Sequence, residues 1–261
     1  MRVSLIIPCY NEEATVGAVL ERVSSLEISG ASKELIVVDD GSTDRTGQII
    51  DAFKFPAGLA ALIHHAPINM GKGASLRVGM ALATGDVIAF QDADLELNPA
   101  ELPKLIACVL SGQADIVFGS RFLAGANGNV PGVTRLANKF LTALTNLLFR
   151  ANLTDMETAY KVFNRNVCDH LRLTSFGFDI EPEITAKMLR LKFTIQEMAI
   201  RYYPRAVCDG KKIRMSDGLE AIWTLLRVRF LPRSMCGWSS DTRGARPQIR
   251  PRRAFGVVNV Y

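Results

Sequence analysis

Five short apolar runs recur along the first half of the chain, and within each run the residues do not alternate with polar ones. Strands that are buried on both faces of a parallel sheet have this composition. The runs are residues 3–7, 35–38, 60–63, 87–90 and 116–118. Because 48% of the 261 residues are hydrophobic and 22% are charged, the chain has the composition of a globular protein with a sizeable core.

Helical patterns separate these runs. Apolar residues at helical spacing follow Asn11 and Ser42, both favourable N-caps, and a third helix is expected over residues 73–83. The alternation of strand and helix predicts βαβ units, and hence an α/β fold with a Rossmann-like, doubly wound and mostly parallel sheet. In such sheets, ligands bind outside the carboxyl ends of the strands.

Polar clusters follow three of the expected strands. They read PCYNEE after residue 7, DDGSTD after residue 38 and QDADLE after residue 90. Because the carboxyl ends of parallel strands meet at one edge of a sheet, we expect the three clusters to line a single crevice. A dinucleotide is not the expected ligand, since no GxGxxG follows the first strand and no GxxxxGK[ST] occurs.

The acids of QDADLE need a positive partner, because clustered carboxylates beside a core are costly. Asp92 and Asp94 are hard oxygen ligands, and with no His or Cys nearby they indicate Mg²⁺ or Mn²⁺. A nucleoside diphosphate would complete the metal shell, and Asp39 and Asp40 would bond its base or ribose. The alternatives are that these acids only solvate a loop and that VVDDGSTD only forms a turn, with Ser42 capping a helix.

Two apolar helical segments distinguish the second half. They are residues 131–150 and residues 219–231, the latter with Trp223 inside and Arg227 and Arg229 near its end. We expect them either to pack on the core or to lie in a membrane interface, where aromatic residues and arginines suit the headgroup layer. No run reaches the roughly 18 apolar residues of a spanning helix.

The last thirty residues differ from the rest. Residues 232–261 contain six arginines and one acid, Asp241, together with several Pro and Gly residues. They are expected to form a disordered basic tail that contacts anionic lipid or is only a solvated terminus. Five scattered cysteines and an N-terminus that soon turns polar favour reduced thiols, no signal peptide and a cytoplasmic location. The modest formal charge of +5 is not taken to indicate a nucleic-acid partner.

Five segments together carry a family resemblance. They are SLIIPCYNEE, VVDDGSTDRT, NMGKGASLRVGMALATGDVIAFQDADLE, FGSRF and TDMETAYKVF. They resemble family 2 glycosyltransferases of the GT-A fold, and more narrowly the dolichyl- and polyprenyl-phosphate sugar synthases such as dolichol-phosphate mannosyltransferases. The resemblance covers about residues 1–231. It implies a nucleotide-sugar half over about residues 1–120 and an acceptor half over about residues 121–231, which includes the amphipathic helices and is followed by the tail.

The resemblance also implies roles for single residues. The expected nucleotide-sugar contacts are Pro8, Tyr10, Glu12, Val38, Asp39, Asp40, Lys72, Asp92, Ala93, Asp94, Arg121, Arg205 and Lys211. The metal would be held by Asp92 and Asp94, with Glu96 as a third ligand at a position where relatives often have Gln. The lipid phosphate would contact Arg121 and Arg135. Catalytic roles fall on Asp92, Asp94, Arg121 and Asp155.

The expected reaction is inverting transfer of mannose or glucose from GDP-mannose or UDP-glucose to a polyprenyl or dolichyl phosphate, at the cytoplasmic face of a membrane. A phosphate monoester, with a second pKa of roughly 6, needs no strong general base. Asp155 is the best alternative base, and otherwise it positions the acceptor or sugar or orders a loop. Glu181 and Glu183 are expected as first-turn acids of a helix rather than site residues.

Three alternatives stay open. The first is a family 2 transferase that acts on a saccharide hydroxyl. The second is a catalytically silent module that binds nucleotide sugars. The third is a peripheral membrane scaffold built on the two amphipathic helices.

Overall fold

The computed structural model of the protein describes residues 1–123, 130–204, 215–232 and 234. Within these residues, seven strands form one sheet in the order β3-β2-β1-β4-β6-β5-β7. The strands are β1 (Arg2–Cys9), β2 (Ser32–Asp39), β3 (Ala60–His65), β4 (Val87–Phe90), β5 (Ile116–Ser120), β6 (Lys161–Asn164) and β7 (Ile195–Ala199). Neighbours run parallel except β6, which is antiparallel to β4 and β5. The expected α/β fold with a mostly parallel sheet is confirmed.

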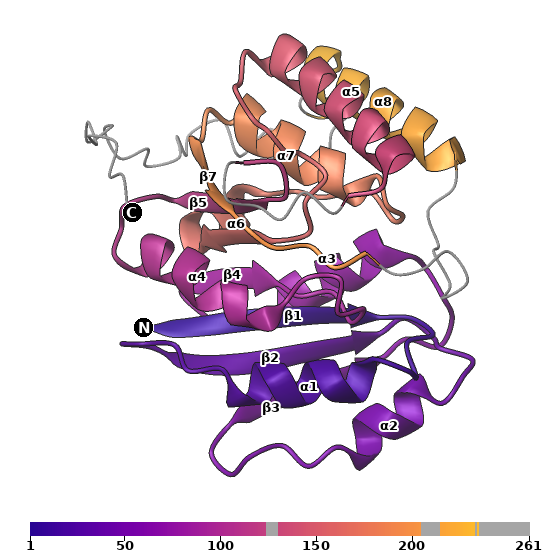
Figure 1. Cartoon of the computed structure of the whole chain (residues 1–261), viewed down its shortest axis with the longest axis vertical. Helices are drawn as coiled ribbons and strands as arrows, with labels where there is room; N and C mark the ends of the chain where they lie inside the picture. Colours follow the sequence, from indigo (N-terminus) through magenta and orange to yellow (C-terminus); the bar gives the residue numbers. More distant parts are fainter. Residues whose placement is uncertain (124–129, 205–214, 233, 235–261) are drawn as a thin grey trace.

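Helices pack against both faces of the sheet, and α5 and α8 lie side by side in the outermost layer at the top of Figure 1. The helices are α1 (Val16–Ser25), α2 (Thr46–Ala52), α3 (Lys72–Leu82), the short 3₁₀ turn η1 (Pro99–Glu101), α4 (Leu102–Leu110), α5 (Gly132–Phe149), α6 (Arg165–His170), α7 (Ile180–Arg190) and α8 (Met215–Phe230). The five apolar runs of the first half form β1 to β5, and the three expected helices form α1 to α3.

Two expected helix starts are wrong. Asn11 and Ser42 do not cap α1 and α2, whose N-cap residues are Thr15 and Arg45. Asn11 instead adopts a left-handed conformation with φ 49°, and its side chain accepts a hydrogen bond from the Thr43 N–H at 2.8 Å. The Asn11 amide thus joins the loops after β1 and β2, a contact between distant segments that helical periodicity does not reveal.

Successive strand residues alternate between two apolar cores on the two faces of the sheet. Leu5 and Ile7 of β1 join the core that includes α1 and α4, whereas Ile6 joins the core that includes α3, α6 and α7. Burial on both faces explains the unbroken apolar runs. β3 is the exception, because it is an edge strand, and its Leu62 is 41% exposed.

A third apolar cluster holds α5, α7 and α8 together. It includes Leu141 of α5, Ala186 of α7 and Leu225 of α8. Core packing, one of the two alternatives for the apolar segments of the second half, therefore describes one face of α5 and of α8. Among the described residues, we find no helix with the length and apolar character of a membrane span.

The carboxyl ends of the parallel strands lie in register. Cys9 of β1 pairs with Asp39 of β2, and Asp39 pairs with His65 of β3. β4 runs parallel to β1 with Phe90 opposite Ile6, so the QDADLE segment leaves the sheet at the same edge. The three polar segments therefore leave the sheet on one side, where α/β folds bind ligands.

Candidate active site

Hydrogen bonds tie together the loops that follow β1, β2 and β4. Thr15 Oγ1 lies 2.7 Å from the Ala93 carbonyl oxygen and 3.1 Å from a Glu12 carboxylate oxygen. The Glu12 N–H donates to Thr46 Oγ1 at 2.7 Å. Three segments that are far apart in the sequence thus form one connected surface at the edge of the sheet.

Asp39 and Asp40, at the end of β2, are buried and held by neighbouring donors. Asp39 accepts from the Ser42 N–H at 3.1 Å, and its other oxygen lies 2.9 Å from His65 Nδ1. Asp40 accepts from the Gly71 N–H at 2.7 Å. Burial is the main reason that the pKa of Asp40 is raised, and its backbone hydrogen bonds oppose the shift. Asp40 therefore fixes the turn from which α3 begins.

Lys72, the first residue of α3, reaches the acidic end of β4. Its Nζ lies 2.9 Å from the Asp92 carboxylate and 3.0 Å from Glu181 Oε1. Burial is the main cause that raises the pKa of Asp92. Asp94 and Glu181 raise it further, while Lys72 opposes the shift. This strand end therefore carries more negative charge than Lys72 neutralises.

The same residues fit a divalent cation. Asp92 and Asp94 supply carboxylate oxygens, which Mg²⁺ and Mn²⁺ prefer, and a bound cation would relieve the excess negative charge. Within the described part of the chain, no three His, Cys, Asp or Glu side chains form a metal-binding group, so Glu96 does not complete a three-ligand set here. Its carboxylate accepts from the Tyr202 hydroxyl at 2.9 Å. The assignment of Glu96 as a ligand stays a prediction.

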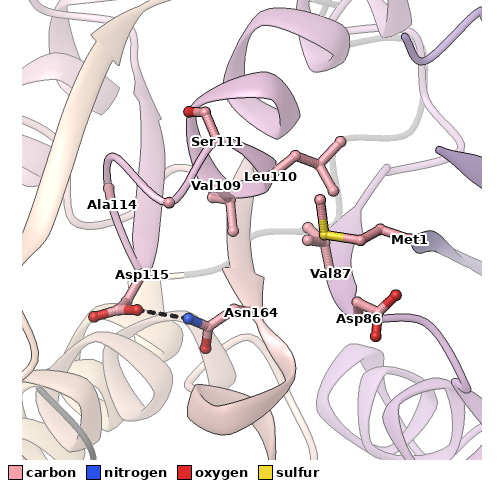
Figure 2. A pocket seen from close by; sticks show the side chains of 10 residues that line it. Met1, Asp86, Val87, Val109, Leu110, Ser111, Ala114, Asp115 and Asn164 are labelled. Carbon is pink, nitrogen blue, oxygen red and sulfur yellow. Dashed lines mark hydrogen bonds between the residues drawn. The ribbon is translucent and has the colours of Figure 1, made fainter. Parts of the chain in front are cut away.

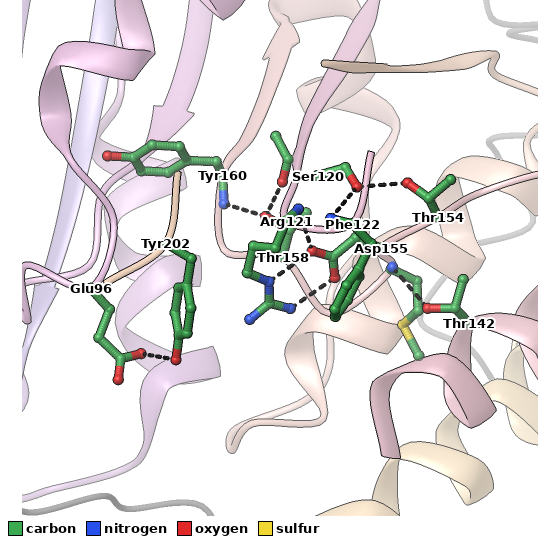
Figure 3. A network of polar contacts seen from close by, with 12 residues as sticks. Glu96, Ser120, Arg121, Phe122, Thr142, Thr154, Asp155, Thr158, Tyr160 and Tyr202 are labelled. Atoms are coloured by element: carbon green, nitrogen blue, oxygen red, sulfur yellow. Dashed lines mark hydrogen bonds and ion pairs between the residues drawn. The ribbon is translucent and has the colours of Figure 1, made fainter. Parts of the chain in front are cut away.

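Arg121, directly after β5, forms a two-point ion pair with Asp155 (Figure 3). Its Nε and Nη2 lie 2.7 and 2.8 Å from the two carboxylate oxygens, and its backbone N–H donates to one of them at 3.0 Å. The guanidinium also packs against Tyr202, whose ring centroid lies 5.4 Å from Cζ. The Asp155 side chain is fully buried. Both of its oxygens are committed to Arg121, which is the geometry of a group that orients the guanidinium.

Glu197 of β7 holds the loop that carries Asp155, and nothing in the sequence pattern indicated it. Its carboxylate accepts from the Thr154 N–H at 2.8 Å and from the Asp155 N–H at 3.0 Å. Thr154 Oγ1 lies 2.6 Å from Ser120 Oγ (Figure 3). The loop is thus anchored to both β5 and β7, and the Arg121 guanidinium is fixed along with it.

Glu181 lies in the first turn of α7, as expected, but its partners were missed. Its side chain is buried between two lysines, because it pairs with Lys72 and also with Lys161 of β6. Lys161 is fully buried, and its Nζ lies 5.0 Å from the centroid of the Phe118 ring. Helical spacing indicates which turn an acid occupies, but it carries no information on cations that other elements contribute. Glu181 is therefore part of the charge network at the end of β4.

The remaining expected residues fall into three groups. Five lie in or directly after β1, β2 and β4, at the edge of the sheet described above: Pro8, Tyr10, Glu12, Val38 and Ala93. Arg135 lies near the beginning of α5. Arg205 and Lys211, expected as donor contacts, lie outside the described residues.

A separate cavity of about 250 Å³ opens at the other end of the sheet (Figure 2). Its lining includes Met1 beside β1, Val87 at the beginning of β4 and Leu110 at the end of α4. Asp115 in its wall accepts a hydrogen bond from Asn164 at 2.6 Å. Because it lies at the amino ends of the parallel strands, this cavity is distinct from the candidate active site.

Comparison with curated proteins gives two informative relatives. The chain is 31% identical over 209 residues to the low-salt glycan biosynthesis hexosyltransferase Agl6 of Haloferax volcanii, covering 77% of this chain and 48% of the relative. It is 36% identical over 243 residues to the dodecaprenyl-phosphate galacturonate synthase of Rhizobium johnstonii, covering 89% of this chain and 68% of the relative. The chain thus spans about half the length of the first relative and about two thirds of the second.

Comparison with solved structures gives the fold. Glucosyl-3-phosphoglycerate synthase from Mycobacterium tuberculosis, in complex with Mn²⁺, UDP and glucosyl-3-phosphoglycerate, superimposes with a TM-score of 0.67 at 23% identity. The superposition covers 88% of this chain and 81% of that one, so the fold is that of the GT-A glycosyltransferases. Residues 4–172 match the family model described as Glycosyl transferase family 2. The chain therefore belongs to glycosyl transferase family 2.

Proposed function

We propose that the protein transfers a hexosyl group from a nucleoside diphosphate sugar to a polyprenyl or dolichyl phosphate, with inversion at the anomeric carbon. An oxygen of the acceptor phosphate forms a new bond to C1 of the sugar. The bond from C1 to the diphosphate breaks, and its electron pair leaves on the diphosphate. The observation that carries the proposal is the charge cluster at the end of β4, where Asp92 lies next to Lys72 at the ligand-binding edge of the sheet.

This cluster suits the leaving diphosphate. The chemistry that a divalent ion on Asp92 and Asp94 would supply is stabilisation of charge on the diphosphate oxygens. Lys72 is paired with Asp92, so its ammonium would lie beside the same phosphates. The proposed nucleoside contacts are Pro8, Tyr10, Glu12, Val38, Asp39, Asp40 and Ala93, and Arg205 and Lys211 stay proposed donor contacts.

Arg121 is the residue that we assign to the acceptor phosphate, with Arg135 as a second cation. Asp155 engages Nε and Nη2 of Arg121, and Nη1 is the nitrogen that would donate to a phosphate oxygen. A phosphate monoester is largely ionised at neutral pH, since its second pKa is roughly 6. No general base is then required, which agrees with an Asp155 carboxylate that is buried against Arg121. The name of the Rhizobium relative supports a polyprenyl phosphate as the acceptor class.

The sugar and the nucleotide are narrower proposals. We expect mannose or glucose, supplied as GDP-mannose or UDP-glucose. Because the name of the Rhizobium relative includes galacturonate, this sugar should be tested as well. A protein of the same fold was crystallised with Mn²⁺ and UDP, so Mn²⁺ and UDP are suitable first probes.

An enzyme with a lipid acceptor must reach a membrane surface. The exposed face of α5 and α8 is suited to contact such a surface. Their outer helical face exposes large apolar side chains: Val133, Leu136, Phe140 and Leu147 of α5, and Leu219, Trp223 and Phe230 of α8. Trp223 is 62% exposed, and Arg229, near the end of α8, is also exposed. Aromatic and cationic side chains on an apolar helical face favour the headgroup layer. We therefore place this face on the cytoplasmic surface of a membrane.

The test is a transfer assay with purified protein, Mn²⁺, labelled sugar nucleotides and a short-chain polyprenyl phosphate. Label is expected in the organic extract, and only when the lipid phosphate is present. Asp92→Asn is expected to lose at least about 99% of this transfer, because one ligand of the metal is removed. Asp169→Asn, at an exposed position of α6, is the matched control and is expected to transfer normally.

Three other outcomes would contradict the proposal, and each would indicate a different function for this protein. Label that appears on a soluble saccharide would indicate a saccharide hydroxyl acceptor. Metal-dependent donor binding without turnover would indicate a binding module. Liposome binding without any donor binding would indicate a membrane scaffold.

A further inference from the structure

His65, the last residue of β3, lies between two carboxylates. Its Nδ1 is 2.9 Å from Asp39 Oδ2, and its Nε2 is 3.1 Å from Asp51 Oδ1. Asp39, at the end of β2, is buried, whereas the Asp51 side chain on α2 is 67% exposed. The ring thus connects a buried acid of the candidate active site to an acid at the surface of the molecule.

Both contacts are satisfied together in only one protonation state of the ring. A neutral imidazole has one N–H donor, whereas the imidazolium has two. The hydrogen bond to Asp39 is the largest cause that raises the pKa of His65, Asp51 raises it further, and burial opposes the shift. Asp39 of β2 and Asp51 of α2 are the charged groups with the largest effect on the pKa of the ring. The charged ring is therefore favoured while both carboxylates are in place.

The surrounding backbone is shaped for this contact. Asp39 and His65 are opposite each other in the β2–β3 ladder. A Cβ atom at Gly47 of α2 would lie 3.1 Å from Asp39 Oδ2, which is a tight contact, and 3.7 Å from the His65 ring, so α2 lies close against the pair. The second Asp39 oxygen accepts from the Ser42 N–H. The orientation of the Asp39 carboxylate is thus determined from both sides.

We propose that His65 is a positioning residue for nucleoside recognition, which orients Asp39 through Nδ1 while Asp51 holds the far side of the ring. The inference rests on the proposed function, in which Asp39 contacts the nucleoside. Loss of the ring proton removes the positive charge from the hydrogen bond between His65 and Asp39. The hold on Asp39 therefore weakens as the pH rises through the raised pKa of His65. Nucleotide affinity is then expected to fall with rising pH, whereas turnover at saturating donor changes little.

The experiment measures the affinity for UDP and for GDP, each with Mn²⁺, by isothermal titration calorimetry between pH 5.5 and pH 9. His65→Gln is expected to weaken binding of the preferred nucleotide about tenfold at pH 6, or about 1.4 kcal/mol, and to flatten the pH profile. Asp51→Asn is expected to move the profile to lower pH while leaving the low-pH affinity unchanged. His64→Gln, at the adjacent residue on the other face of β3, is the matched control and is expected to behave as the native protein.

Two further readouts separate positioning from a structural effect. The ring signals of His65 in an NMR titration should report a lower pKa in Asp51→Asn than in the native protein. The KM for the donor should rise in His65→Gln while kcat is kept. Native-like affinity and pH dependence in both His65→Gln and Asp51→Asn would overturn the inference and leave the proposed function standing. Failure of the native protein to bind UDP or GDP at any pH would overturn the proposed function, and this inference with it.

Discussion

The N-terminal and C-terminal halves of the molecule stabilise their buried carboxylates in different ways. In the N-terminal half, an acid at a strand end accepts from backbone N–H groups of a nearby loop, as Asp40 does from Gly71 at 2.7 Å. In the C-terminal half, Glu181 and Glu183 of α7 pair with buried lysines, whereas Glu197 of β7 accepts from backbone N–H groups. Glu183 and Lys187 of α7 are both fully buried and lie 2.7 Å apart.

This difference determines which substitutions each half can tolerate. Backbone donors are placed by loop conformation, so the N-terminal half depends on residues that permit tight turns. A buried ion pair depends on both partners, because removal of one leaves a charge without compensation. The N-terminal half should therefore be sensitive to its glycines and the C-terminal half to its lysines and arginines.

The largest expected effect is on the buried pair of α7. Lys187→Met removes the ammonium 2.7 Å from Glu183 and leaves the buried carboxylate with the more distant Arg227 at 3.5 Å, which should lower the free energy of unfolding by about 3–5 kcal/mol. The measurement is urea denaturation at pH 7. In the double variant Lys187→Met, Glu183→Gln, most of this loss should be recovered, since no buried charge then lacks its partner.

The control for this prediction is an ion pair on the surface of the N-terminal half. Arg45 and Glu13 lie 3.1 Å apart, with 75% and 40% of their side chains exposed. Arg45→Ala should cost about 0–1 kcal/mol, because solvent screens exposed charges. If Lys187→Met and Arg45→Ala lowered the free energy of unfolding equally, the proposed difference between the two halves would be wrong.

The next largest effect is expected at a glycine in a turn of the N-terminal half. Gly41 has φ +68°, and a Cβ atom there would lie 2.5 Å from the Ile68 carbonyl carbon. Gly41→Ala should destabilise the fold by about 2–4 kcal/mol, as the sum of left-handed strain and a backbone clash. Gly30→Ala is the matched control, because Gly30 has φ +78° but open space around it, so only the strain of about 1–2 kcal/mol is expected. A Gly41→Ala variant no less stable than Gly30→Ala would argue against the clash.

The smallest effect concerns an acid of the C-terminal half that lacks a full set of partners. Burial is the main cause that raises the pKa of Glu157 to about 7, and Lys161 opposes the shift. Its Oε1 is buried and has no hydrogen-bond partner among the described residues. Since the pKa is higher in the folded than in the unfolded chain, the folded state binds more protons between about pH 4.5 and pH 7. The stability contributed by this group therefore falls as the pH rises through that range.

Glu157→Gln keeps the shape of the protonated side chain and removes this dependence. Relative to the native protein, it should be more stable by about 1–3 kcal/mol at pH 8 and nearly equal at pH 4.5. Urea denaturation at the two pH values measures the difference. A stability difference that does not change between them would show that Glu157 has an ordinary pKa.

The same contrast explains how much the sequence could predict. The five strands of the first half and the motifs at their ends were visible, because burial on both faces and turn chemistry leave local patterns. Asp92 and Asp94 were found in this way. Their neighbour Glu181 appeared only as a first-turn acid, since its partners Lys72 and Lys161 come from other elements.

The C-terminal half shows the limit of local patterns. Glu197 anchors the Asp155 loop from a strand 42 residues away along the chain, and Tyr202 packs on Arg121. No periodicity or motif encodes such contacts, because they depend on the order of strands in the sheet. His65 is the last residue of β3, and its position between two acids requires the β2–β3 register and the approach of α2.

The proposed reaction requires that the acids at the end of β4 bind a divalent ion together with a nucleoside diphosphate. The most direct measurement is an electron paramagnetic resonance titration of free Mn²⁺, with and without UDP or GDP, for the native protein, Asp92→Asn and the control Asp169→Asn. The native protein and the control should take up Mn²⁺, more tightly with the preferred nucleotide, and Asp92→Asn should bind it at least about tenfold more weakly. Equal Mn²⁺ uptake by Asp92→Asn and the native protein, in the presence of that nucleotide, would contradict the claim.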